Sequence, residues 1–159
     1  MADDYLSSSD PTLQWIVDWF EQPGAYLLIT LALPGMLVSG RIISAAEYFR
    51  GFGNLYIQAT SEGTQRSNWD QFFGNLATAA EADLVRRTDL MSALKPDMPD
   101  EERQKILKAT ERRHIHLQEV LILASGGAPV RAPFWRGRLE QVVGWHFGML
   151  NWPLAQPQG

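Results

Sequence analysis

Residues 26–43 read YLLITLALPGMLVSGRII, and this stretch predicts a β-hairpin. Leu or Ile recurs at every second position from Leu27 to Leu33, which is the period of a strand. Pro34-Gly35 then signals a turn, because proline fixes φ and glycine permits a positive φ. Residues 36–43 form the second predicted strand.

Helices with N-terminal capping signals are predicted on both sides of this hairpin. Before it, Asp10 can accept hydrogen bonds from the free N–H groups of a helix start, and Pro11 is tolerated at the first helical position. After the hairpin, Ser44 and Glu47 form a capping box that opens a second helix. The first helix has an apolar face of Leu13, Ile16, Val17 and Phe20 and ends at Gln22-Pro23-Gly24; in the second, Gly51 and Gly53 weaken the helical pattern.

The rest of the chain alternates between helix-forming and strand-forming stretches. A helical pattern covers residues 68–94, and a short charged helix is predicted at 100–110. Strands are predicted at 114–124, 130–139 and 142–150, and Pro133 is typical of a sheet edge or a bulge. The two tails, residues 1–9 and 152–159, are predicted to be loose.

This order of elements predicts an α+β fold in a single domain, residues 1–159. Five short strands after one helix suit a small closed β-barrel, because closure removes exposed sheet edges. Residues 10–50 and 113–150 supply the two halves of the barrel. Residues 51–112 form a helical insertion between the second and third strands.

Several classes of function are excluded by composition and motif. The chain has no cysteine, which excludes disulfide frameworks, thiolate zinc sites and cysteine nucleophiles. It also lacks a P-loop, a dinucleotide-binding glycine pattern and a Gly-x-Ser-x-Gly nucleophile motif, so we expect no enzyme and no cofactor. The histidines His114, His116 and His146 lack the spacing of a metal motif. The acidic start and the short apolar run 26–38 indicate a cytoplasmic protein without a membrane partner.

Charge is unevenly spread along the chain, whose net charge is -4. The first 40 residues contain five acids and no Lys or Arg, whereas residues 103–138 carry eight basic groups against two acids. These two regions could attract each other between molecules in a salt-sensitive way. Local ion pairs on a solvated surface are the alternative.

Three stretches resemble the gas vesicle protein U family. The first is residues 28–49, LITLALPGMLVSGRIISAAEYF, and the second is residues 115–120, IHLQEV. The third joins PFWRGRL at 133–139 to VVGWHFG at 142–148, with Trp145 where the family usually has Phe. The resemblance implies a bacterial gas-vesicle accessory protein that self-assembles and promotes vesicle clustering, with the vesicle shell or other gas vesicle proteins as partners.

The two barrel halves also look like an Sm-like fold, whose members form rings by strand pairing between subunits. That likeness leaves open an alternative function, a ring-forming module that binds RNA or another ligand. In Trp135-Arg136-Gly137-Arg138 the arginines could bind phosphate while the ring stacks on a base, or Trp135 could fill the core while Gly137 permits a bend. We expect no nucleic-acid partner, because the net charge is negative.

The candidate residues for self-association or vesicle contact come from the Trp-Arg-Gly stretch and from aromatic residues near the two ends of the chain. Trp15, Trp19, Trp145 and Trp152 could meet in space, and aromatic residues are enriched in interfaces. Core packing is the alternative role for these rings. The full set of candidates is Trp135, Arg136, Arg138, Trp145, His146, Phe147, Trp15 and Trp19.

Overall fold

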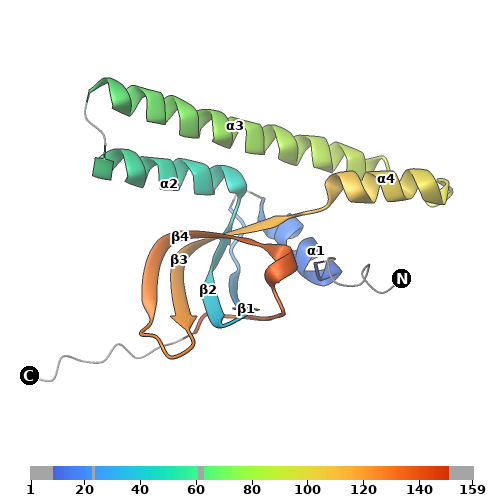
Figure 1. The fold of residues 1–159 in the computed structure, drawn as a ribbon. Coiled ribbons are helices and arrows are strands. Elements are labelled where there is room, and N and C mark those ends of the chain that lie inside the picture. Colours follow the sequence, from blue (N-terminus) through green and yellow to red (C-terminus); the bar gives the residue numbers. More distant parts are fainter. Residues whose placement is uncertain (1–8, 23, 61–62, 151–159) are drawn as a thin grey trace, which may run out of the picture.

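The computed structural model of the chain describes residues 9–22, 24–60 and 63–150. In chain order its elements are α1 (Pro11–Phe20), β1 (Leu28–Leu33), β2 (Met36–Ile43), α2 (Ala45–Thr60), α3 (Thr64–Ser92), α4 (Asp100–Thr110), β3 (His114–Ala124), β4 (Val130–Arg138), the 3-10 turn η1 (Leu139–Gln141) and β5 (Gly144–Phe147). Over these ranges the fold is α+β, with α2, α3 and α4 inserted between β2 and β3 (Figure 1).

The five strands form one antiparallel sheet in the order β4-β3-β2-β1-β5. Within the described ranges, β4 pairs with β3 alone and β5 pairs with β1 alone. The prediction of a closed barrel is therefore wrong, because the sheet keeps two open edges. The chain passes from one edge to the other through η1, where Leu139 is buried, and β5 is shorter than predicted because Gly148 takes a φ of +99° directly after it.

The core lies between α1 and the sheet. Asp10 caps α1 as predicted, since its Oδ1 accepts from the backbone N of Thr12 at 2.8 Å and of Leu13 at 3.4 Å. The buried apolar side chains of the core come from α1, β1, β2, β3 and η1: Leu13, Ile16, Val17, Ile29, Leu31, Val38, Ile42, Ile115, Leu117, Val120 and Leu139. Burying such side chains stabilises the fold by roughly 1.5–3 kcal/mol each. The three buried residues of α1 therefore hold this helix firmly against the sheet.

The β1–β2 hairpin is confirmed, and it carries a buried hydroxyl pair. Gly35 in its turn has a φ of +79°. Thr30 and Ser39 face each other across the hairpin with their hydroxyl oxygens 2.9 Å apart, and both side chains are buried. Thr30 donates to the carbonyl of Gly148 at 2.8 Å, so Ser39 must donate to Thr30, and Ser39 in turn accepts from the backbone N of Leu150 at 2.9 Å. The pair thereby fixes the segment that follows β5.

A local irregularity interrupts the regular pairing of β3 with β2. The β2–β3 register shifts between Ser39 and Arg41, and Glu119 of β3 takes a φ of +57°. Gly40 leaves room for this approach, because a Cβ there would lie 3.0 Å from the carbonyl oxygen of Gln118. Pro133 lies in the edge strand β4, and the β3–β4 register is the same on both sides of it, so the edge position is confirmed and the alternative of a bulge is not.

The helical insertion begins with the predicted capping box. The Glu47 backbone N donates to Ser44 Oγ at 3.1 Å, and Glu47 Oε2 accepts from the Ser44 backbone N at 2.9 Å. α2 continues through Gly51 and Gly53. Glycine is needed at both positions, because a Cβ there would overlap the rings of Phe134 and Phe73 respectively. α2 and α3 lie side by side and extend beyond the sheet (Figure 1). None of the helices in the described ranges is both long enough and apolar enough to span a membrane.

The predicted loose tails fall almost wholly outside the described residues, as does Trp152. Ser9 is the exception. It is buried, and its backbone and side-chain oxygens both accept from the Gln14 side chain.

Candidate interaction surface

Two tryptophans stand on the outer face of α1. The apolar face of the helix turns Leu13, Ile16 and Val17 into the core, so the residues between them point outward. Trp15 and Trp19, four residues apart, are 64% and 63% exposed, and their ring centroids lie 6.0 Å apart. Exposure of two large neighbouring rings is typical of a contact surface.

The edge strand β5 carries three of the predicted candidates. The half-buried ring of Trp145 packs against the core, and its Nε1 donates to Asp10 Oδ2 at 2.8 Å. Phe147 is 59% exposed and meets the Trp145 ring edge to face at 5.5 Å. His146 is exposed, with Nδ1 at 2.9 Å from the carbonyl of Phe147. The two ends of the described chain therefore meet where β5 lies beside the start of α1.

The Trp-Arg-Gly stretch lies on the opposite edge strand, β4. The half-buried Trp135 ring packs against the core, so it does not form a free stacking platform beside Arg136. Gly137 is needed because a Cβ would overlap the Trp135 ring, which corrects the prediction of a bend. Arg136 and Arg138 are both exposed; Arg138 pairs with Glu140 at 2.8 Å.

The predicted candidates thus divide between the two sides of the sheet. Trp145, His146 and Phe147 form one edge, next to the start of the helix that carries Trp15 and Trp19, whereas Trp135, Arg136 and Arg138 form the other. Three strands separate β4 from β5 in the sheet order. Each edge strand has one side of its backbone unpaired within the described part of the chain, which leaves N–H and C=O groups for another chain.

A buried charge cluster, which the sequence did not predict, joins α1 to the helical insertion. Glu21 follows α1 and is only 2% exposed. Its Oε2 contacts the guanidinium groups of Arg112 and, at 3.4 Å, of Arg87. Asp18 also pairs with both arginines, and Asp83 Oδ2 lies 2.9 Å from Arg87 Nε. Two acids of the first 40 residues, Asp18 and Glu21, are therefore paired within the chain. The uneven distribution of charge along the sequence was the signal that could have indicated this cluster.

The electrostatics of this cluster keep Glu21 ionised. Burial would raise the pKa of its carboxyl, but His116 and the positive charges of Arg112 and Arg87 outweigh burial and hold that pKa below its ordinary value. A buried cluster of this kind is costly to break, because removal of one partner leaves the others buried without compensation.

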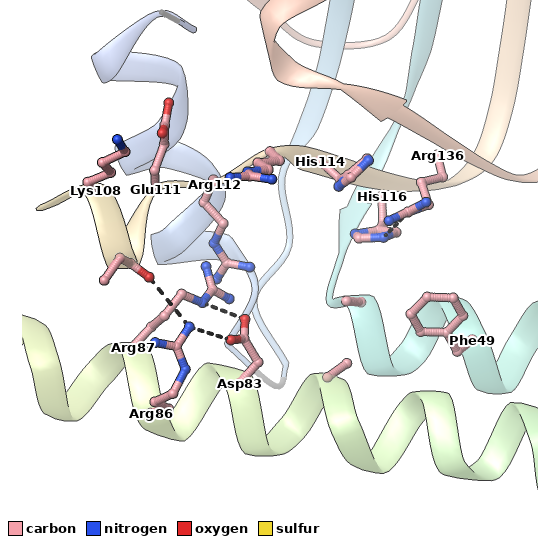
Figure 2. Close-up of a pocket in the computed structure, with 14 residues that line it drawn as sticks. Phe49, Asp83, Arg86, Arg87, Lys108, Glu111, Arg112, His114, His116 and Arg136 are labelled. Carbon is pink, nitrogen blue, oxygen red and sulfur yellow. Dashed lines mark hydrogen bonds and ion pairs between the residues drawn. The ribbon is translucent and has the colours of Figure 1, made fainter. Parts of the chain in front are cut away.

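His116 lies beside the same cluster and contacts β4 (Figure 2). Arg136 Nε donates to His116 Nε2 at 3.2 Å, which places the imidazole proton on Nδ1, 3.8 Å from Glu21 Oε1. Burial lowers the pKa of His116, and Glu21 only partly opposes this effect, so the ring stays neutral near neutral pH. Within the described residues no three His, Asp or Glu side chains gather as a metal site would require.

Comparison with known protein families gives a match over most of the chain. The family model described as "Gas vesicle protein GvpU-like" matches residues 10–150, which is most of the chain. No curated protein and no solved structure matches this chain. The matched range begins at the helix cap Asp10 and ends at Leu150, whose backbone N donates to Ser39, so it covers the whole sheet and the helical insertion. The chain belongs to the GvpU-like family of gas vesicle proteins.

Proposed function

We propose that this chain is a non-enzymatic accessory protein of gas vesicles, which self-associates through the two edges of its sheet and so clusters vesicles or helps to assemble them. The observation that carries the proposal is the open sheet, whose edges β4 and β5 each pair on one side only within the described ranges. We place the protein in the cytoplasm, at the vesicle surface.

The two edges differ, and this difference sets the kind of assembly. β4 has nine residues and carries Arg136 and Arg138, whereas β5 has four and carries Trp145 and Phe147. Pairing of β4 from one copy with β5 from the next is a head-to-tail contact. Such a contact repeats from copy to copy into a ring or a filament.

An assembly of many copies multiplies any contact with a vesicle. Trp15 and Trp19 are the best exposed rings in the candidate set and lie on the outer face of α1. We assign to them the contact with the vesicle shell or with another gas vesicle protein. Weak single contacts then become strong when many copies engage at once.

The absence of cysteine permits a direct test of the head-to-tail contact. Phe147→Cys on β5 and Arg131→Cys on β4 would be mixed in equal amounts and treated with a short thiol-to-thiol crosslinker. The mixture should give a covalent dimer that neither variant gives alone. Lys105→Cys on α4, whose side chain is 73% exposed, is the matched control and should not crosslink to Phe147→Cys. Equal crosslinking in both mixtures, or none in either, would reject edge pairing.

A further inference from the structure

We propose that a basic pocket beside the helical insertion binds a small ligand that carries phosphate or carboxylate groups. The basic pocket, of about 440 Å³, lies where α3 meets the α4–β3 junction and the sheet (Figure 2). Its cationic side chains are Arg86, Arg87, Lys108, Arg112, Arg113 and Arg136. Its carboxylates are Asp83 and Glu111. The basic pocket shares Arg136 with the sheet edge β4, but its other cations come from α3, α4 and the α4–β3 junction.

The floor of the basic pocket consists of two buried arginines that are held by ion pairs. Arg87 and Arg112 are 8% and 7% exposed; Glu21 and Asp18 pair with both guanidinium groups, and Asp83 pairs with Arg87. Because these side chains are buried and already paired without a ligand, binding has less side-chain freedom to restrict.

The charges of the basic pocket do not balance. Asp18, Glu21 and Asp83 offset Arg86, Arg87 and Arg112, with which they pair. The remaining cations, Lys108, Arg113 and Arg136, face only one further carboxylate, that of Glu111. None of these three cations forms an ion pair with another described residue, although Arg136 donates to His116. An excess of two positive charges is left for a ligand.

The excess of positive charge in the basic pocket also affects the pKa of His114. Burial lowers the pKa of His114, and the positive charge of Arg136 lowers it further, together with smaller effects of its other neighbours. A neutral imidazole adds no charge of its own and can still donate or accept a hydrogen bond.

The donors define the chemistry of the ligand. Guanidinium groups present paired N–H donors that match the oxygens of phosphate and carboxylate, and these charge-assisted bonds are strong. The remaining wall is apolar, with Phe49, Ala45, Ala80 and Ala109. A compact molecule with more than one anionic group fits both the charge excess and the volume.

Titration calorimetry on the full chain at low salt tests this proposal with two probes, pyrophosphate for the phosphate source and citrate for the carboxylate source. Binding of either probe identifies the source. Arg113 and Glu111 are exposed, so both can be changed with little risk to the fold. Arg113→Ala should weaken binding about tenfold, which is the loss of one charge-assisted hydrogen bond.

The opposite change and a control keep the test decisive. Glu111→Gln removes an acid from the basic pocket and should tighten binding severalfold, a result that damage to the fold would not produce. Arg66→Ala, an exposed arginine of α3 outside the basic pocket, should leave affinity unchanged. Failure of both probes to bind would overturn the proposal. Equal weakening by Arg66→Ala and Arg113→Ala would also overturn it, because the ions would then respond only to overall charge.

Discussion

The indole N–H of Trp145 donates to the carboxylate of Asp10 across 2.8 Å and so joins the edge strand β5 to the N-terminus of α1. The other oxygen of the same carboxylate caps the helix by accepting from the Thr12 backbone N. The hydrogen bond from Trp145 has the largest effect on the pKa of Asp10, which lies below its ordinary value; burial opposes it, and the backbone N–H groups of Thr12 and Leu13 lower the pKa further. One side chain therefore fixes both a helix start and the edge that the proposed assembly uses.

Removal of either partner should weaken the fold, and removal of both should not add up. Asp10→Ala loses the cap and the bond and should lower the free energy of unfolding by about 2 kcal/mol. Trp145→Phe loses the bond and should cost about 1 kcal/mol. The double variant should lose about 1 kcal/mol less than the sum, as measured by urea unfolding. Strict additivity would show that the bond contributes nothing.

The buried charge cluster should depend on Glu21. Glu21→Gln leaves Arg87 and Arg112 buried with less compensation and should lower the free energy of unfolding by about 3 kcal/mol. Glu101→Gln breaks an exposed pair with Lys105 and should change it by less than about 0.5 kcal/mol. Thermal or chemical unfolding of both variants provides the comparison. Similar small losses in the two would mean that the cluster does not hold α1 to the insertion.

Stability should fall in acid, and His116 should contribute to the fall. Its pKa in the folded chain lies below its ordinary value of 6.5, so the unfolded chain takes up the proton first when pH drops through that value. The pKa of Glu21 is also lowered, so its contribution is present above its ordinary value of 4.5 and is lost as pH falls further, through its folded pKa. His116→Gln should flatten the slope of unfolding free energy between about pH 7 and about pH 5. An unchanged slope would show that burial of His116 does not control it.

A pair of helical glycines should respond in opposite directions to alanine. Gly51→Ala places a Cβ in the ring of Phe134 and should destabilise the fold, even though alanine favours helix by about 1 kcal/mol. Gly74→Ala in α3 meets nothing within 4 Å and should stabilise it by about that amount. Melting temperatures of the two variants give the answer. A stabilising Gly51→Ala would disprove the tight packing of α2 on β4.

The exposed tryptophans of α1 should serve vesicle contact and not the fold. Trp15→Ser with Trp19→Ser should leave the unfolding free energy nearly unchanged, because both rings face solvent. In a flotation assay, the same double variant should no longer rise together with purified gas vesicles. Retained flotation with vesicles would move the contact to another surface.

The parts of the fold that depend on neighbouring residues could be predicted from sequence. The turn at Pro34-Gly35 and the caps at Asp10 and Ser44 use chemistry that acts within four residues, and all three are confirmed. Whether the sheet closes could not be predicted in this way. It depends on the path of the chain through η1 from one edge to the other and on the end of β5 at Gly148. Gly51 weakens the helical pattern in the sequence, and its role could not be predicted because the Phe134 ring that it accommodates comes from a distant strand.

The charge pattern shows a similar limit. Sequence reveals how many charges a region holds but not which partner each one meets. Glu21 and Asp18 pair with Arg87 and Arg112 inside one chain, so two of the five acids in the first 40 residues are already engaged within the molecule. The same contact explains why the basic pocket has a fixed floor.

Light scattering behind a sizing column, at low and at high salt, tests self-association most directly. Edge pairing uses backbone hydrogen bonds, and Asp18 and Glu21 are already engaged within the chain, so we expect a mass of several copies at both salt concentrations. A monomer at both would contradict the central claim. An oligomer that dissociates completely at high salt would also contradict it, because charge and not edge pairing would then hold the copies together.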